Sequence, residues 1–141
     1  MKLVFNTNDA LVMQSVYFGQ RFWRFGASLK QIIAIGDAID RTIHEYEDLK
    51  SALSKLSTAG LIQIKGEKVF ITSLYRTGRK EVKKRIGKYD CETDLIIHVL
   101  KKFEQKELFA LKDLPEGFLT KTKWSIAYSN YKYDFQKQLD N

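Results

Sequence analysis

Residues 49–72 read LKSALSKLSTAGLIQIKGEKVFIT, and the spacing of the apolar residues changes once along this stretch. The leucines between residues 49 and 56 recur at three- and four-residue steps, which is typical of one face of a helix. Two short apolar runs, 61–64 and 69–72, then flank a polar turn with a glycine at residues 65–68. Such runs around such a turn predict a β-hairpin. The stretch therefore predicts a helix followed directly by two strands.

The predicted helix before this hairpin runs from Glu45 to Ala59. Acidic residues Glu45, Glu47 and Asp48 occupy its first turn, where the helix dipole favours negative charge. Gly60 stands where a left-handed C-terminal cap belongs. These signals make it the best-defined helix of the chain.

Apolar periodicity predicts five further helices. Ser28 with Gln31 three positions later has the form of a capping box at the start of one of them. Gly36 inside the same helix is expected to permit close approach of another element. The alternation of Tyr131, Tyr133 and Phe135 is also compatible with a β-strand in the last segment. The predicted bounds are Asp9 to Phe25, Leu29 to Asp40, Arg76 to Tyr89, Thr93 to Gln105, and Trp124 to Leu139.

Length and composition bound the class of protein. A chain of 141 residues with 44% hydrophobic residues fits one compact domain with its own core, and it is too apolar for disorder. No apolar run approaches the roughly 20 residues of a membrane-spanning helix. The early polar residues and the single cysteine, Cys91, argue against secretion and a disulfide framework. We therefore expect a cytoplasmic protein without membrane contact.

Positive charge is concentrated in one part of the chain. Residues 61–90 hold nine Lys and Arg against three Asp and Glu, which accounts for nearly all of the formal net charge of +7. A concentrated basic segment is the electrostatic footprint of a protein that binds nucleic-acid phosphates. A merely solubilising surface is the alternative.

The order of three helices and a hairpin, together with the pattern Leu-x-x-Leu-x-x-x-Gly-Leu-Ile at residues 53–62, resembles bacterial winged-helix DNA-binding regulators of the MarR-like and PadR-like kind. The resemblance covers about residues 28–85. It implies a mainly α chain with a small β-hairpin wing, an α+β fold, in which a winged helix-turn-helix carries extra N- and C-terminal helices. Residues 1–90 would form the winged-helix domain with its N-terminal helix. Residues 91–141 would form a helical extension that packs on it or makes a dimer.

In such regulators the third helix enters the major groove of duplex DNA, the wing touches phosphates, and the protein often acts as a homodimer. Transferred to this sequence, the resemblance implies groove contacts by Lys50, Ser51, Ser54 and Lys55. It implies phosphate contacts at the wing by Lys65 and Lys68. The basic segment adds five further candidate phosphate ligands, Arg76, Arg79, Lys80, Lys83 and Lys84.

Residues that could carry catalysis are few. Beyond carboxylates the chain offers His44, His98 and Cys91, and none of them forms a recognisable catalytic or metal-binding spacing. Acidic neighbours of Cys91 favour the neutral thiol rather than the reactive thiolate. We therefore expect a protein that is not an enzyme and uses no metal or cofactor.

Two alternative functions remain open at this level. The acidic start of the third helix would repel phosphates, so the chain could be a protein-interaction module that does not bind DNA. The aromatic residues between Trp124 and Phe135 would then bind the partner; taken by themselves they could form a dimer seam, a platform on which bases stack, or simply the core contact of a terminal helix. The basic helix from Arg76 could instead bind RNA without entering a groove.

Overall fold

The computed structural model describes residues 2–22, 24–107 and 110–140, which form a mainly helical fold with one small hairpin. This confirms the predicted α+β class. None of the described helices is both long and apolar enough to cross a lipid bilayer. The helices are α1 (Thr7–Phe22), α2 (Leu29–Asp40), α3 (Tyr46–Thr58), α4 (Ser73–Ile86), α5 (Glu92–Lys102) and α6 (Lys121–Leu139), and the strands are β1 (Ile62–Lys65) and β2 (Lys68–Ile71).

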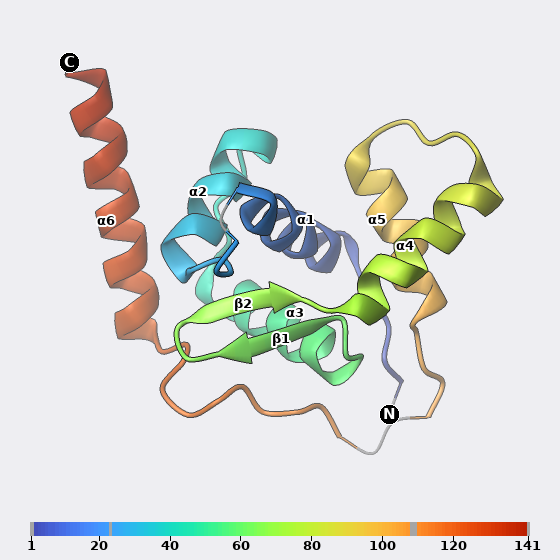
Figure 1. Ribbon diagram of the computed structural model, residues 1–141. Coiled ribbons are helices and arrows are strands. Elements are labelled where there is room, and N and C mark those ends of the chain that lie inside the picture. The colour runs from blue at the N-terminus through green and yellow to red at the C-terminus, as the bar shows by residue number, and fades with distance from the viewer. Residues whose placement is uncertain (1, 23, 108–109, 141) are drawn as a thin grey trace.

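Helix α1 lies at the centre of the arrangement. It packs against α2, α3, α5 and strand β2, while α4 packs on α5 and α6 on α2 (Figure 1). The hairpin runs from the side of α6 towards α4, and α6 stands at the edge of the fold with its C-terminal end pointing away from it. The two basic parts of the chain, the hairpin turn and α4, therefore lie at opposite ends of the hairpin.

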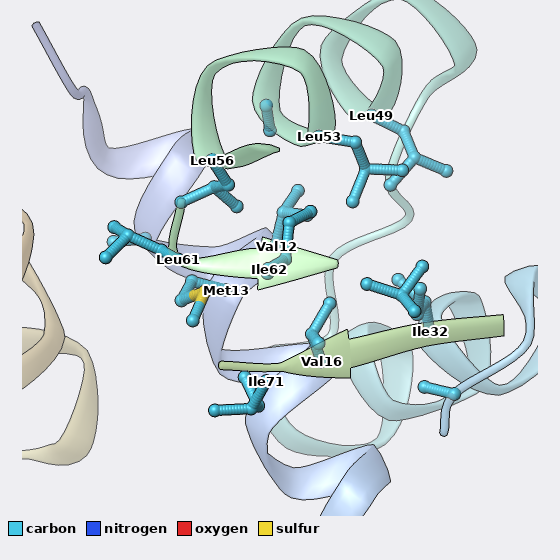
Figure 2. Close-up of a cluster of buried hydrophobic side chains, with 14 of the residues drawn as sticks. Val12, Met13, Val16, Ile32, Leu49, Leu53, Leu56, Leu61, Ile62 and Ile71 are labelled. Carbon is cyan, nitrogen blue, oxygen red and sulfur yellow. The ribbon is translucent and has the colours of Figure 1, made fainter. Parts of the chain in front are cut away.

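A single apolar core joins α1, α2, α3 and the hairpin. Figure 2 shows side chains from these elements converging between the helices and the two strands. Each labelled side chain is at most 5% exposed. Burying a side chain of this kind contributes roughly 1.5–3 kcal/mol, so the cluster is the main source of stability. Its labelled members are Val12, Met13, Val16, Ile32, Leu49, Leu53, Leu56, Leu61, Ile62 and Ile71.

Helix α1 begins two residues earlier than predicted because of a cap that the apolar pattern does not reveal. The Asn6 side chain accepts a hydrogen bond from the Asp9 amide at 2.9 Å, and the Asp9 carboxylate accepts one from the Asn6 amide at 2.8 Å. This reciprocal pair has the form of a capping box. The predicted end at Phe25 is wrong, since Phe25 lies in a turn beyond the helix; residue 23 lies outside the described residues.

Helix α4 lies about one turn earlier than its predicted bounds. Thr72 caps it, because its hydroxyl accepts a hydrogen bond from the Tyr75 amide and donates one to the Gly60 carbonyl. The helix ends at Gly87, whose φ of 69° lies in the left-handed region that glycine favours. These two residues displace the helix from the predicted range of Arg76 to Tyr89.

The other predicted elements agree closely with the structure. The capping box of Ser28 and Gln31 is present, and α2 has the predicted bounds. Residues 131–135 are helical, so the strand alternative for them is wrong. Helix α5 ends three residues earlier than predicted, because residue 105 instead makes an antiparallel bridge to residue 3. A second bridge pairs Ala27 with Val69 and extends the hairpin at β2.

The close approach predicted at Gly36 is confirmed. A Cβ atom on Gly36 would lie 2.6 Å from Nε2 of His44, so only glycine fits there. His44 is itself buried, with Nε2 2.8 Å from the Ser15 hydroxyl of α1. Burial lowers the pKa of His44 from its ordinary value of 6.5 to about 4, and the nearby Asp48 carboxylate offsets this in part.

This buried histidine makes stability depend on pH. Between pH 6.5 and 4 the unfolded chain binds a proton at His44 and the folded chain does not, so the free energy of unfolding falls as the pH falls. The loss should approach about 3 kcal/mol below pH 4. Urea denaturation between pH 7 and pH 4 measures it. A His44→Gln variant should show a flatter profile over this range, and an unchanged profile would contradict the assignment.

Candidate nucleic-acid interface

Helix α4 carries a row of exposed cations on the side away from the core. Its inner side is set by Tyr75, Gly78 and Val82, which are buried. Arg76, Lys80, Lys83 and Lys84 are exposed and recur at steps of three and four residues, so they share the outer side. We call these four residues the α4 basic face.

Close packing fixes the rotation of α4. A Cβ atom at Gly78 would lie 2.6 Å from two atoms of the Phe103 ring at the end of α5. Gly78 therefore allows α4 to lie directly on this ring. With that side pressed against α5, the α4 basic face is left in solvent.

The charges of the α4 basic face have no carboxylate partner within the part of the chain that the structure describes, although the Arg76 guanidinium donates to the Ile71 carbonyl at 3.4 Å and the Lys83 ammonium lies 6.0 Å from the centre of the Tyr89 ring. Lys80, Lys83 and Lys84 make no ion pair there. The acidic residue of α4, Glu81, lies beside the face and pairs instead with Lys102 of α5. At 1.5 Å per residue the face spans about 12 Å along the helix. This is enough to follow several successive phosphates of a duplex.

Arg79 does not belong to the α4 basic face, although the sequence placed it among the phosphate ligands. It is only 9% exposed and forms an ion pair with Glu92 of α5. Its guanidinium lies 4.2 Å from the centre of the Tyr17 ring and 3.5 Å from the Tyr75 hydroxyl. The residue joins α1, α4 and α5, so we remove it from the set of phosphate ligands.

The outer side of α3 is partly occupied by the chain itself. Residues 110–114, which we call the strap, cross it between α5 and α6. The Ser54 hydroxyl donates to the Lys112 carbonyl at 2.6 Å, and the Lys112 amide donates to the Thr58 hydroxyl at 2.8 Å. Lys55 points the other way and pairs with the buried Asp9 at 2.7 Å. Ser54 and Lys55 are therefore engaged within the fold.

Two of the four predicted groove residues remain open to solvent. Lys50 and Ser51 are exposed, but they follow the exposed carboxylates of Glu47 and Asp48 one turn earlier. Carboxylates at this position repel the phosphates that a groove-reading helix must approach. The geometry thus disfavours α3 as the element that reads bases.

The hairpin turn forms a smaller basic site. Lys65 is exposed with its ammonium 5.8 Å from the centre of the Phe70 ring, and Lys68 is partly buried. Between them Glu67 pairs with Lys123 of α6 at 3.1 Å. The turn therefore offers less free positive charge than α4.

The residues considered for catalysis are scattered. His44 is buried, Cys91 is exposed, and His98 is partly exposed with Nε2 3.7 Å from Asp94. Among the described residues no three His, Cys, Asp or Glu side chains come together to hold a metal ion.

Sequence reasoning missed the strap and the additional exposed cations Arg85 and Lys88. The cations were visible in the basic run. No local sequence pattern predicts the strap, because Lys112 forms hydrogen bonds with Ser54 and Thr58, which lie more than 50 residues earlier in the chain.

Comparisons with models of known protein families, with curated proteins and with solved structures give no match to this chain.

The structural role of Arg79 separates it from its neighbour Lys80. Arg79→Gln should lower the free energy of unfolding by about 2–3 kcal/mol, because it leaves Glu92 without its cation in a partly buried site. Lys80→Gln removes the same charge from an exposed position and should change it by less than about 0.5 kcal/mol. Urea denaturation of both variants provides the comparison. Equal stabilities would show that Arg79 has no structural role.

Proposed function

We propose that this protein is a winged-helix protein that binds duplex DNA by its phosphate backbone, with the α4 basic face as the main contact. The observation that carries the proposal is the row formed by Arg76, Lys80, Lys83 and Lys84. These cations share one side of a helix, are exposed, and have no carboxylate among them. Lys65 and Lys68 of the hairpin turn would make a second, weaker contact.

The element order supports the winged-helix part of the proposal. Helices α1, α2 and α3 precede the hairpin, and the bridge between Ala27 and Val69 adds a short third segment beside β2. The pattern at residues 53–62 adds the resemblance to MarR-like and PadR-like regulators. On the basis of this resemblance, we propose that the protein takes part in the control of transcription and that it lies in the cytoplasm.

The mode of binding departs from that resemblance. With Ser54 bonded to the strap and Lys55 paired to Asp9, α3 presents few free donors to base edges. Contacts to phosphates position a protein on a duplex but carry no sequence information by themselves. We therefore propose binding with little dependence on base sequence.

Fluorescence anisotropy with a labelled random-sequence duplex tests the proposal. Four phosphate contacts predict a slope near −3.6 for the logarithm of the binding constant against the logarithm of salt concentration, at about 0.9 per contact. A Lys80→Glu, Lys84→Glu variant should bind at least about tenfold more weakly and show a shallower slope. The experiment uses the full chain at several salt concentrations.

A matched control carries the same change of charge on α6. Lys132→Glu, Lys137→Glu replaces two other exposed lysines and should leave affinity nearly unchanged. Equal losses in both variants would mean that net charge, not the α4 basic face, governs binding. Tighter binding to duplex or single-stranded RNA of the same length would mean that the protein binds RNA and not DNA. The absence of binding at low salt would refute it.

A further inference from the structure

The outer side of the hairpin presents side chains that the core does not use. Strands β1 and β2 pair in register, with Lys65 opposite Lys68 and Gln63 opposite Phe70. Side chains alternate between the two sides of a strand, and the residues between these four, such as Ile71, turn towards the helices α1 and α3. Lys65, Lys68, Gln63 and Phe70 therefore share the other side. We call these four residues the outer hairpin face, and in the view of Figure 1 no described helix passes in front of the hairpin.

Two lysines of the outer hairpin face stand opposite each other without an acidic partner. Lys65 and Lys68 form a directly opposed pair of the antiparallel ladder, where like charges repel. Neither lysine forms an ion pair within the described part of the chain, and the carboxylate of Glu67 in the turn between them pairs instead with Lys123 of α6. An anion between the two ammonium groups would remove the repulsion. The pair therefore favours a bound phosphate.

An aromatic ring lies next to the two lysines on the same face. Phe70 is partly exposed, and the Lys65 ammonium lies 5.8 Å from the centre of its ring. The segment before α2 fixes the ring, because a Cβ atom on Gly26 would lie only 2.9 Å from its Cζ atom. The bridge between Ala27 and Val69 holds Gly26 in this place. The ring is thus fixed by the backbone beside it while part of it stays in contact with water.

The spacing on the outer hairpin face matches the parts of one nucleotide. Same-side neighbours on a strand stand two residues apart, which separates the lysine pair from the pair of Gln63 and Phe70 by about 6.6 Å. This separation is close to the reach from the phosphate of a nucleotide to its own base. The Gln63 amide lies opposite Phe70 and has both donors and an acceptor for the edge of a base. The face thus offers groups for a phosphate, a base plane and a base edge.

We propose that the outer hairpin face binds single-stranded DNA, with an unpaired base stacked on Phe70 and a phosphate held between Lys65 and Lys68. Both faces of a base inside a duplex are covered by its neighbours, so only an unpaired base stacks on a protein ring. The four side chains include no carboxylate to accept a hydrogen bond from the 2′-hydroxyl that marks RNA, which favours DNA. The phosphate contacts of the two lysines rest on the proposed function; the stacked base and the preference of this face for a single strand go beyond it.

Fluorescence anisotropy with a labelled oligothymidylate of about twelve nucleotides tests the proposal. The full chain with Lys80→Glu and Lys84→Glu serves as the background, because its weakened α4 basic face competes less for the strand. Two phosphate contacts predict a slope near −1.4 for the logarithm of the binding constant against the logarithm of salt concentration, at about 0.7 per contact for a single strand. In this background Phe70→Leu should weaken binding at least about fivefold, since it removes the ring on which the base stacks. Phe70→Tyr keeps a ring and should stay within about twofold of the background.

Two controls separate stacking from charge and from folding. An abasic strand of the same length keeps the phosphates and lacks the bases, so the background protein should bind it at least about fivefold more weakly than oligothymidylate. The Phe70→Leu variant should bind both strands alike. Phe135→Leu makes the same change in a ring that is 48% exposed on α6 and should leave affinity unchanged. The comparison of the two strands uses one folded protein and does not depend on how a variant folds.

Each possible failure points to a different part of the argument. Equal binding of the two strands by the background protein, or equal losses in Phe70→Leu and Phe135→Leu, would overturn the stacking proposal. Tighter binding of a single-stranded RNA of the same length would overturn the assignment to DNA. The random-sequence duplex is measured in parallel with the wild type and Phe70→Leu, which should bind it equally. Absence of duplex binding together with base-dependent binding of the single strand would refute the role of the α4 basic face and leave this inference standing.

Discussion

The polar residues of helix α1 specify which elements surround it. A buried polar group must find a hydrogen-bond partner, so each such residue fixes the position of a neighbour. The carboxylate of Asp9 binds Lys55 of α3, Gln14 binds Thr93 of α5, Ser15 contacts His44, and Gln20 accepts from the Ile71 amide of β2. Apolar contacts supply most of the stability, but they are less selective than these bonds. The central helix thus holds four other parts of the chain in register.

Local signals in the sequence predict most of the helices and the hairpin, because caps and periodicity act over a few residues. Gly60 and the leucines of α3 are examples. Errors occur where a single polar side chain moves a boundary, as Thr72 does for α4. The candidate site is less predictable. Whether a lysine or arginine is free depends on distant partners, such as Asp9 for Lys55 and Glu92 for Arg79, and neither partner lies within the same local pattern.

The basic side chains between positions 61 and 90 therefore fall into two groups, according to whether the fold gives them a partner. Arg79 is used as a structural link between helices, since a planar guanidinium can contact an aromatic ring and a carboxylate at once. The remaining cations of α4 stay in solvent, because Gly78 brings the opposite side of the helix against Phe103. A count of charges would treat these residues alike. Their surroundings give them different roles.

The long connection between α5 and α6 has a consequence for the order of folding. Helix α6 meets α2 through contacts that span 104 residues of chain, such as Lys30 with Asp134, and the segment before α1 meets the end of α5 over a similar separation, 99 residues between Phe5 and Glu104. Contacts of high sequence separation form late, because more chain entropy is lost in closing them. During synthesis, residues up to the end of α5 can assemble while α6 is still inside the ribosome. Helix α6 emerges after these elements and then docks on a body that is already folded.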